Sequence, residues 1–157
     1  MLETANSLPE VAFHFYGRVD SGFKQRFGAG QFDPPNVEYH GVFDSVSGDV
    51  QAELSQCDLH LLPTSWLNEG VPGVLEETKI ATVPSVVSDC CHNAEVVKDG
   101  IDGIVLKERT ERNSSAAIAG CARNPVRLDE VKHAALVSAE RFYIDCYVDL
   151  IVSELAA

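Results

Sequence analysis

Short apolar runs alternate along this chain with longer segments of helical character. Five runs have the length and the β-branched or aromatic content of strands, at residues 11–17, 36–41, 57–63, 84–89 and 103–106. Helical patterns are expected at residues 21–27, 47–56, 73–81, 93–98, 115–122 and 128–155, the last broken near Phe142. Strands separated by helices form parallel βαβ units. The sequence therefore predicts one α/β domain with a doubly wound parallel sheet and helices on both faces.

Length and charge limit the classes of partner. The 157 residues are enough for one domain with a sizeable core, and no apolar run approaches the roughly 18 residues of a membrane span. A formal net charge of −12 argues against nucleic acid and anionic lipid, which both require a positive surface. The five cysteines are odd in number and have no CxxC spacing, so we expect free thiols in a cytoplasmic protein.

The stretch WLNEGVPG, followed by VLEETKIATV, says most about chemistry. A Gly-rich loop leads into a helix, with Glu69 before the loop and Glu77 one turn inside the helix. Backbone N–H groups at such a helix start bind anions, usually phosphate. Carboxylates beside them accept hydrogen bonds from sugar hydroxyls. A nucleotide-sugar is the ligand that this combination predicts, and it would lie beyond the carboxyl ends of the strands.

Several separate motifs carry a resemblance to a known family. In order, they are FHFYG, NVEYHG, LHLLPTSW, NEGVPGVLEET, ATVPSVVSD and AEVVKDGIDGIVL. In order and spacing, over roughly residues 8–120, they resemble the carboxyl-terminal, donor-binding half of retaining glycosyltransferases of the GT-B fold, family four (group 1). The resemblance implies that residues 1–157 form one Rossmann-like domain, half of a GT-B enzyme.

The same resemblance implies a role for each matching residue. Glu69 would be the catalytic carboxylate beside the transferred sugar, and Glu77 would bind the ribose hydroxyls. Val42 and Phe43 would lie beside the base, and Glu95 would pack under the loop. The sugar and diphosphate would be bound by the backbone of Gly70, Val71, Pro72, Gly73, Val74 and Leu75. The family implies no cofactor and no metal site, because the helix dipole and cations stabilise the leaving diphosphate.

The chain also departs from the family pattern. It begins after the strand that carries G-R-x-x-x-x-K-G, and the acceptor-binding amino-terminal domain is missing, so we expect a truncated piece. Arg18 and Lys24 imitate the missing cations, but their spacing favours surface positions. Thr82 stands where the family usually has Gly. The missing strand is central in such sheets, so its neighbours should either pair directly or leave open edges, through which the chain could dimerise.

Several of the candidate residues could also have an ordinary structural role. Glu69 and Glu77 could be solvated carboxylates near a helix start. His14, His40 and His60 lie within strand patterns and are expected as core or strand-end residues. Cys90, Cys91 and His92 lack a fourth ligand at the usual spacing for zinc. The late helices should cover the sheet, with Phe142, Tyr143 and Tyr147 on a buried face.

Three functions follow from these patterns. The leading one is a parent enzyme that transfers a sugar from a nucleotide diphosphate to a glycan or glycolipid, with retention of configuration, in polysaccharide biosynthesis. Such an enzyme would be cytoplasmic or membrane-peripheral, and the isolated chain would bind nucleotide weakly without turnover. The second is a different enzyme on the same fold, such as a nucleotide-sugar epimerase or a phosphorylase-type enzyme. The third is a non-catalytic module for nucleotide binding or oligomerisation.

Overall fold

The computed structural model describes residues 2–19, 34–44, 46, 48–67 and 70–155. The described strands are β1 (Phe13–Tyr16), β2 (Val37–Gly41), β3 (His60–Leu62), β4 (Ser85–Ser88) and β5 (Gly103–Leu106). Each lies within a predicted run, and all the pairings are parallel. The doubly wound α/β prediction is therefore confirmed, with the strands divided between two sheets.

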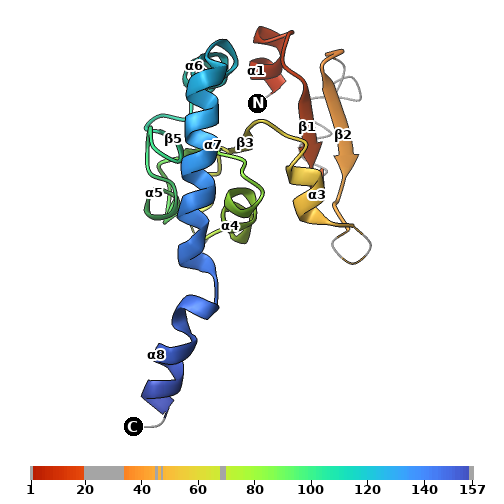
Figure 1. The fold of residues 1–157 in the computed structure, drawn as a ribbon. Helices are drawn as coiled ribbons and strands as arrows, with labels where there is room; N and C mark the ends of the chain where they lie inside the picture. Colours follow the sequence, from red (N-terminus) through yellow and green to blue (C-terminus); the bar gives the residue numbers. More distant parts are fainter. Residues whose placement is uncertain (1, 20–33, 45, 47, 68–69, 156–157) are drawn as a thin grey trace.

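The division falls where the central strand was expected to be missing. One sheet has the order β1-β2 and the other the order β3-β4-β5, with no ladder between β1 and β3. Figure 1 shows the β1–β2 pair beside the other strands. Of the two predicted outcomes, direct pairing of β1 with β3 does not occur, and within the described residues no strand pairs with their facing edges. Side chains bridge them instead, because Phe13 and Phe15 of β1 share a hydrophobic cluster with Leu59 and Leu61.

Helix α1 (Leu2–Ser7) closes one end of this cluster. Its Ala5 is buried with Leu8 among the same apolar side chains. Asn36, just before β2, fixes the segment through its side-chain amide, which donates to the carbonyl oxygens of Ala5, Leu8 and Val11 at 3.0, 3.0 and 2.9 Å. One half-buried amide thus ties together three carbonyl oxygens of the segment that runs from α1 to β1.

The second sheet holds the main core. All four residues of β4 are buried, as expected for a central parallel strand covered on both faces. Val87 packs with Val105 of β5 and with Leu75, Val96 and Val97 from the flanking helices. This core holds the helix that carries the predicted glycine-rich site.

The helices follow the predicted segments with shifted ends. They are α3 (Val50–Leu54), α4 (Gly73–Ile80), α5 (Asn93–Val96), α6 (Glu111–Arg123), α7 (Pro125–Ala139) and α8 (Asp145–Leu155), with a 3₁₀ turn, η1 (Glu140–Phe142), before α8. The cap residues explain the shifts. Thr110 accepts a hydrogen bond from Asn113 N, so α6 begins earlier than predicted, and Asp49 accepts from Gln51 and Ala52 at the start of α3. The predicted helix at 21–27 lies outside the described residues.

Helix α4 ends in a backbone conformation that strongly favours glycine. Thr82 N donates to Lys79 O and Val83 N to Thr78 O, the two bonds of a Schellman motif. This motif places Thr82 at φ 64°, in the left-handed region. This backbone conformation accounts for the glycine that the resemblance implies at this position.

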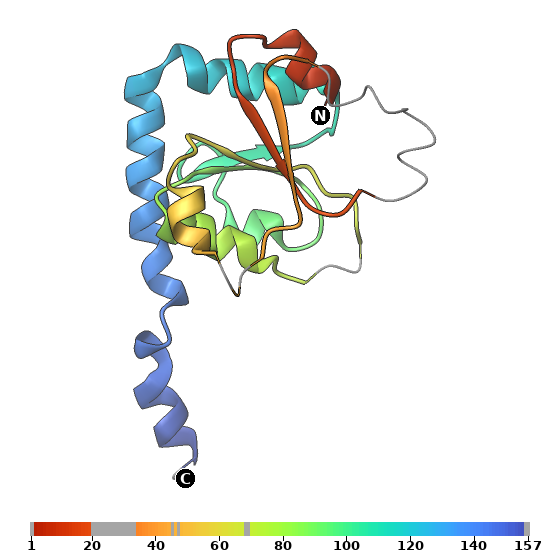
Figure 2. The ribbon, with the colours of Figure 1, turned by 90° about the vertical axis from the view of Figure 1, so that its right-hand side faces the viewer.

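The prediction that the late helices bury Phe142, Tyr143 and Tyr147 is correct only for the first. Phe142 packs against the main core, but Tyr143 and Tyr147 are exposed. Figures 1 and 2 show why, since α8 projects away from the body and carries the carboxyl terminus with it. Among the described helices, none is both long and apolar enough to cross a membrane.

Candidate functional site

The loops that follow β2 and β3 meet through their helices. Residues 42–44 lead toward α3 and residues 63–67 and 70–72 toward α4, and α3 contacts α4. Both views show α3 and α4 side by side (Figures 1 and 2). The predicted base-binding residues and the predicted phosphate loop therefore belong to the same edge, at the carboxyl ends of the strands.

The start of α4 has the features of an anion-binding helix terminus. Pro72 occupies the N-cap position and provides no side-chain hydrogen bond to the first turn. The first N–H groups of a helix have no intrahelical acceptor, so a ligand can satisfy them. A Cβ atom added at Gly70 or Gly73 would meet nothing within 4 Å. The glycines thus leave open space in front of these donors.

Glu77 lies on α4 one turn after Gly73 and is half-buried. Its carboxylate makes no hydrogen bond or ion pair with the other described residues, so it remains available for a ligand. Glu69, the predicted catalytic carboxylate, lies outside the described residues.

The other residues predicted to contact the ligand differ in how far their side chains are buried. Pro72 and Leu75 are buried, so they can offer a ligand only backbone, whereas Val71 is exposed and Val74 half-buried. Val42 is 64 % exposed. Phe43 is half-buried and packs edge-on against Tyr16, with ring centroids 6.3 Å apart.

The loops after β3 and β4 are tied together by side-chain contacts to backbone carbonyls. Ser88 Oγ donates to Thr64 O at 2.6 Å, and Cys91 Sγ lies 3.1 Å from Trp66 O. The Trp66 ring is 67 % exposed. These contacts hold the backbone that leads into the glycine-rich loop.

The predicted packing of Glu95 under the loop is not seen among the described residues. Glu95 is exposed, and its carboxylate lies 2.8 Å from His92 Nδ1. Arg18 is exposed, in agreement with a surface position, and Lys24 lies outside the described residues.

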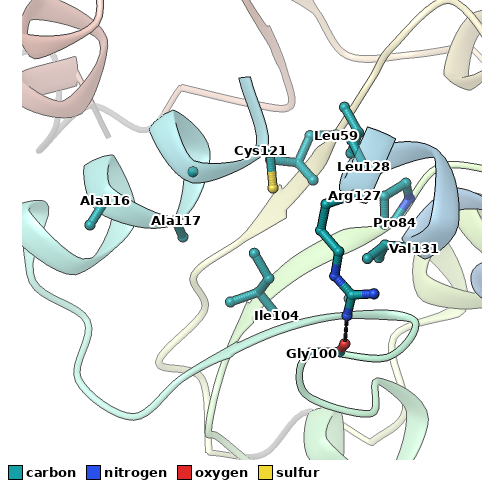
Figure 3. A pocket seen from close by; sticks show the side chains of 12 residues that line it. Leu59, Pro84, Gly100, Ile104, Ala116, Ala117, Cys121, Arg127, Leu128 and Val131 are labelled. Carbon is teal, nitrogen blue, oxygen red and sulfur yellow. Dashed lines mark hydrogen bonds between the residues drawn. The ribbon is translucent and has the colours of Figure 1, made fainter. Parts of the chain in front are cut away.

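A cavity of about 270 Å³ lies at the opposite, amino-terminal edge of the second sheet. Figure 3 shows Leu59, Pro84 and Ile104 beside α6 and α7, with the Arg127 guanidinium bonded to Gly100 O. The cavity is lined mainly by apolar side chains and lies away from Gly73 and Glu77. It does not belong to the predicted site.

The three strand histidines differ in environment. His60 is half-buried beside Ser85 Oγ at 3.0 Å, and burial lowers its pKa to about 4. The prediction for His14 and His40 allowed two positions, the core or a strand end. Both side chains are exposed, so the core position is wrong. Glu38 and His40 are spaced i, i+2 on one strand, a signal that both side chains share a face.

The family follows from a direct comparison. A family model described as glycosyl transferases, group 1, matches residues 2–124. The chain belongs to this family. No curated protein matches the chain in sequence. The predicted resemblance to group 1 enzymes of the GT-B fold is thereby confirmed.

Solved structures show the same fold as this member of the group 1 family. The Anabaena protein HepE in complex with UDP-glucose aligns at TM-score 0.78 and 14 % identity, over 98 % of this chain and 44 % of HepE. The pneumococcal O-GlcNAc transferase GtfA, in complex with UDP and GlcNAc, aligns at 0.76 and 19 %, over 99 % of this chain and 31 % of GtfA. WaaG, a glycosyltransferase involved in lipopolysaccharide biosynthesis, aligns at 0.69 and 18 %, over 88 % and 38 %. This chain therefore spans less than half the length of each of these proteins.

Proposed function

We propose that residues 1–157 are the carboxyl-terminal, donor-binding domain of a retaining glycosyltransferase that uses a nucleotide diphosphate sugar. The observation that carries the proposal is the start of α4. There, within eight residues, lie an N-cap without a side-chain hydrogen bond, two glycines beside open space, and Glu77, whose carboxylate has no partner among the described residues. Support also comes from the group 1 family match and from structural neighbours that bind UDP or UDP-glucose.

Each part of the site has a chemical task in this proposal. The N–H groups at Gly73 and Val74 bind the diphosphate and stabilise the charge that develops on it as the sugar leaves. Glu77 accepts hydrogen bonds from the ribose hydroxyls, and Glu69 binds the transferred sugar. Val42 and Phe43 contact the base. We propose that sugar transfer at this site uses no metal ion. The acceptor would attack the sugar from the face that the leaving diphosphate occupied.

The acceptor would bind to a second domain that is not among these 157 residues. We propose that the isolated chain binds nucleotide weakly and has no turnover, because one wall of the cleft and the diphosphate-binding Arg and Lys are supplied elsewhere. In the complete enzyme the domain would be cytoplasmic or membrane-peripheral and would serve glycan or glycolipid assembly.

Calorimetric titration with UDP, GDP and ADP tests the proposal. We expect saturable binding of one of them, weakened about tenfold or more in Glu77→Ala, because a charge-assisted hydrogen bond contributes about 1.5–3 kcal/mol. Glu76→Ala is the matched control, since it removes the same charge from the next position of α4. An equal loss of nucleotide affinity in both variants would mean that Glu77 acts only through its negative charge and not through a hydrogen bond to the ligand. Absence of binding by all three nucleotides would reject a competent donor site in this chain.

The open edges of β1 and β3 favour a second candidate, a module that acts by association. The two strands share no ladder, and an unpaired strand edge is a template for another strand. A homodimer through this gap would appear as a concentration-dependent mass in sedimentation equilibrium. A monomer at all concentrations, together with nucleotide binding, would favour the donor-binding domain.

A further inference from the structure

Three metal-binding side chains lie on one exposed face of the β1–β2 sheet. The register pairs His14 with Glu38 across the two strands, and His40 follows Glu38 by two residues. Within the described residues, these are the three that place one ligand atom each within 4.8 Å of the others. The proposed donor site uses none of these three side chains, although Tyr16, which stacks on His40, also packs against Phe43.

The spacing of the three ligand atoms suits a first-row transition metal. His14 Nδ1 is 2.9 Å from His40 Nε2, and Glu38 Oε2 is 3.8 Å from the first nitrogen and 3.9 Å from the second. A triangle with these sides has a circumcentre about 2.1 Å from each corner, and zinc bonds to nitrogen and carboxylate oxygen are about 2.0–2.2 Å long. Tetrahedral angles around such an ion need a longer His14–His40 distance and shorter distances from Glu38 to both nitrogens, each by about half an ångström.

A bound ion would replace the hydrogen bond between the two imidazoles. Their centroids are 5.1 Å apart and the planes differ by 25°, so the facing nitrogens share one hydrogen between nearly parallel rings. A metal requires a lone pair on both nitrogens. One ring must therefore carry its hydrogen on its other nitrogen, a change of tautomer that leaves the neutral charge of the ring unaltered.

A neighbouring side chain holds His40 in place. The Tyr16 ring stacks on His40 with centroids 4.6 Å apart and planes 9° apart, and the Tyr16 hydroxyl donates to a Glu53 carboxylate oxygen. Partners that fix the orientation of a ligating ring raise its affinity for metal. Tyr16 is thus a positioning residue for the cluster.

We propose that His14, Glu38 and His40 bind a divalent transition-metal ion, zinc in the first instance, with a fourth position open to water. Two imidazoles and one carboxylate are a known zinc ligand set. The ion would join β1 to β2, a two-stranded sheet with an open edge, and isolated two-stranded sheets are only marginally stable. Its role is therefore structural and separate from the metal-free transfer chemistry proposed above.

Calorimetry with zinc chloride tests this site. We expect one ion per chain, at least a tenfold weaker affinity in His14→Ala and in His40→Ala, and a smaller loss in Glu38→Gln. His133→Ala is the matched control, because it removes an exposed histidine from α7 and should leave affinity unchanged. Zinc should also raise the midpoint of thermal unfolding in the wild type and not in His14→Ala, since a ligand that binds only the folded state stabilises it.

Cobalt distinguishes this cluster from the cysteine pair. Cys90 Sγ and Cys91 Sγ lie 3.4 Å apart, and thiolate ligation gives sulfur-to-cobalt charge-transfer bands that imidazole and carboxylate ligands do not give. A cobalt spectrum with those bands that persists in His40→Ala would overturn the proposal. Absence of saturable zinc binding by the wild type would overturn it as well. If an alanine variant loses its circular dichroism spectrum, the shape-preserving Glu38→Gln decides the matter.

Discussion

Lys79 Nζ lies 2.8 Å from Asp102 Oδ2, and both side chains are almost completely buried, at 2 % and 1 % exposure. The ammonium group also donates to Ser138 Oγ at 2.7 Å, and Asp102 Oδ1 accepts from Lys98 N at 2.7 Å. The pair therefore joins α4, the segment before β5 and α7. Because α4 carries the glycine-rich loop at its other end, this ion pair fixes the helix whose start forms the proposed donor site.

Removing one partner of this pair should destabilise the domain. Lys79→Met leaves the Asp102 carboxylate buried without its cation, which costs about 3–5 kcal/mol for comparable buried pairs. Urea unfolding should show this loss, and Lys79→Met with Asp102→Asn should recover part of it. Lys132→Met is the control, because the Lys132–Asp58 pair lies at the surface and should contribute below about 1 kcal/mol. An equal loss of unfolding free energy in Lys79→Met and Lys132→Met would contradict a special stabilising role for the buried pair.

Thr82→Gly should stabilise the domain. A β-branched side chain at φ 64° is strained, and the left-handed conformation costs an L-residue about 1–2 kcal/mol relative to glycine. The midpoint of urea unfolding should rise at constant slope. Thr82→Ala should gain less, because alanine keeps the Cβ that causes the strain. A lower midpoint in Thr82→Gly would mean that contacts of the threonine side chain outweigh its backbone cost.

Gly73→Ala should separate ligand binding from folding. The added Cβ meets no protein atom within 4 Å, and φ at Gly73 is not in the left-handed region, so the unfolding free energy should not fall. The methyl group would instead enter the space in front of the first N–H groups of α4 and weaken nucleotide binding about tenfold, or about 1.4 kcal/mol. Gly120→Ala, equally open but on α6, is the matched control. Unchanged nucleotide affinity in Gly73→Ala would place the diphosphate elsewhere.

His60 should make stability depend on pH between about 4 and 6.5. Burial lowers its pKa from 6.5 to about 4 in the folded state, so within this window the unfolded chain binds more protons than the folded one. Stability therefore rises with pH through the window and is lost as pH falls, by about 2–3 kcal/mol in total. Urea unfolding from pH 7 down to pH 4 measures this. His60→Gln can still hydrogen-bond Ser85 but does not titrate, and an equal pH dependence in that variant would assign the effect to other groups.

The order of strands and helices could be read from the sequence because it depends on local patterns. Apolar runs such as PSVVSD have the length and the β-branched content of a buried strand, and all four residues of β4 are buried. The start of α4 at Gly73 was likewise visible, since glycine, proline and the following periodic segment mark a helix start. The family resemblance rested on these same residues and was confirmed by the match to residues 2–124.

Long-range contacts were decided only by the tertiary structure. Nothing in the sequence near Lys79 reveals a partner 23 positions later, because a buried charge is tolerated only where the fold brings its counter-ion within reach. The exposed cluster of His14 and His40 depends on the register of β1 against β2, which sets which side chains share a face. The sequence by itself determined the strands, most of the helices, their order and the glycine-rich loop. The separation of the two sheets, the burial of charge and the projection of α8 were decided by packing between residues far apart in the chain.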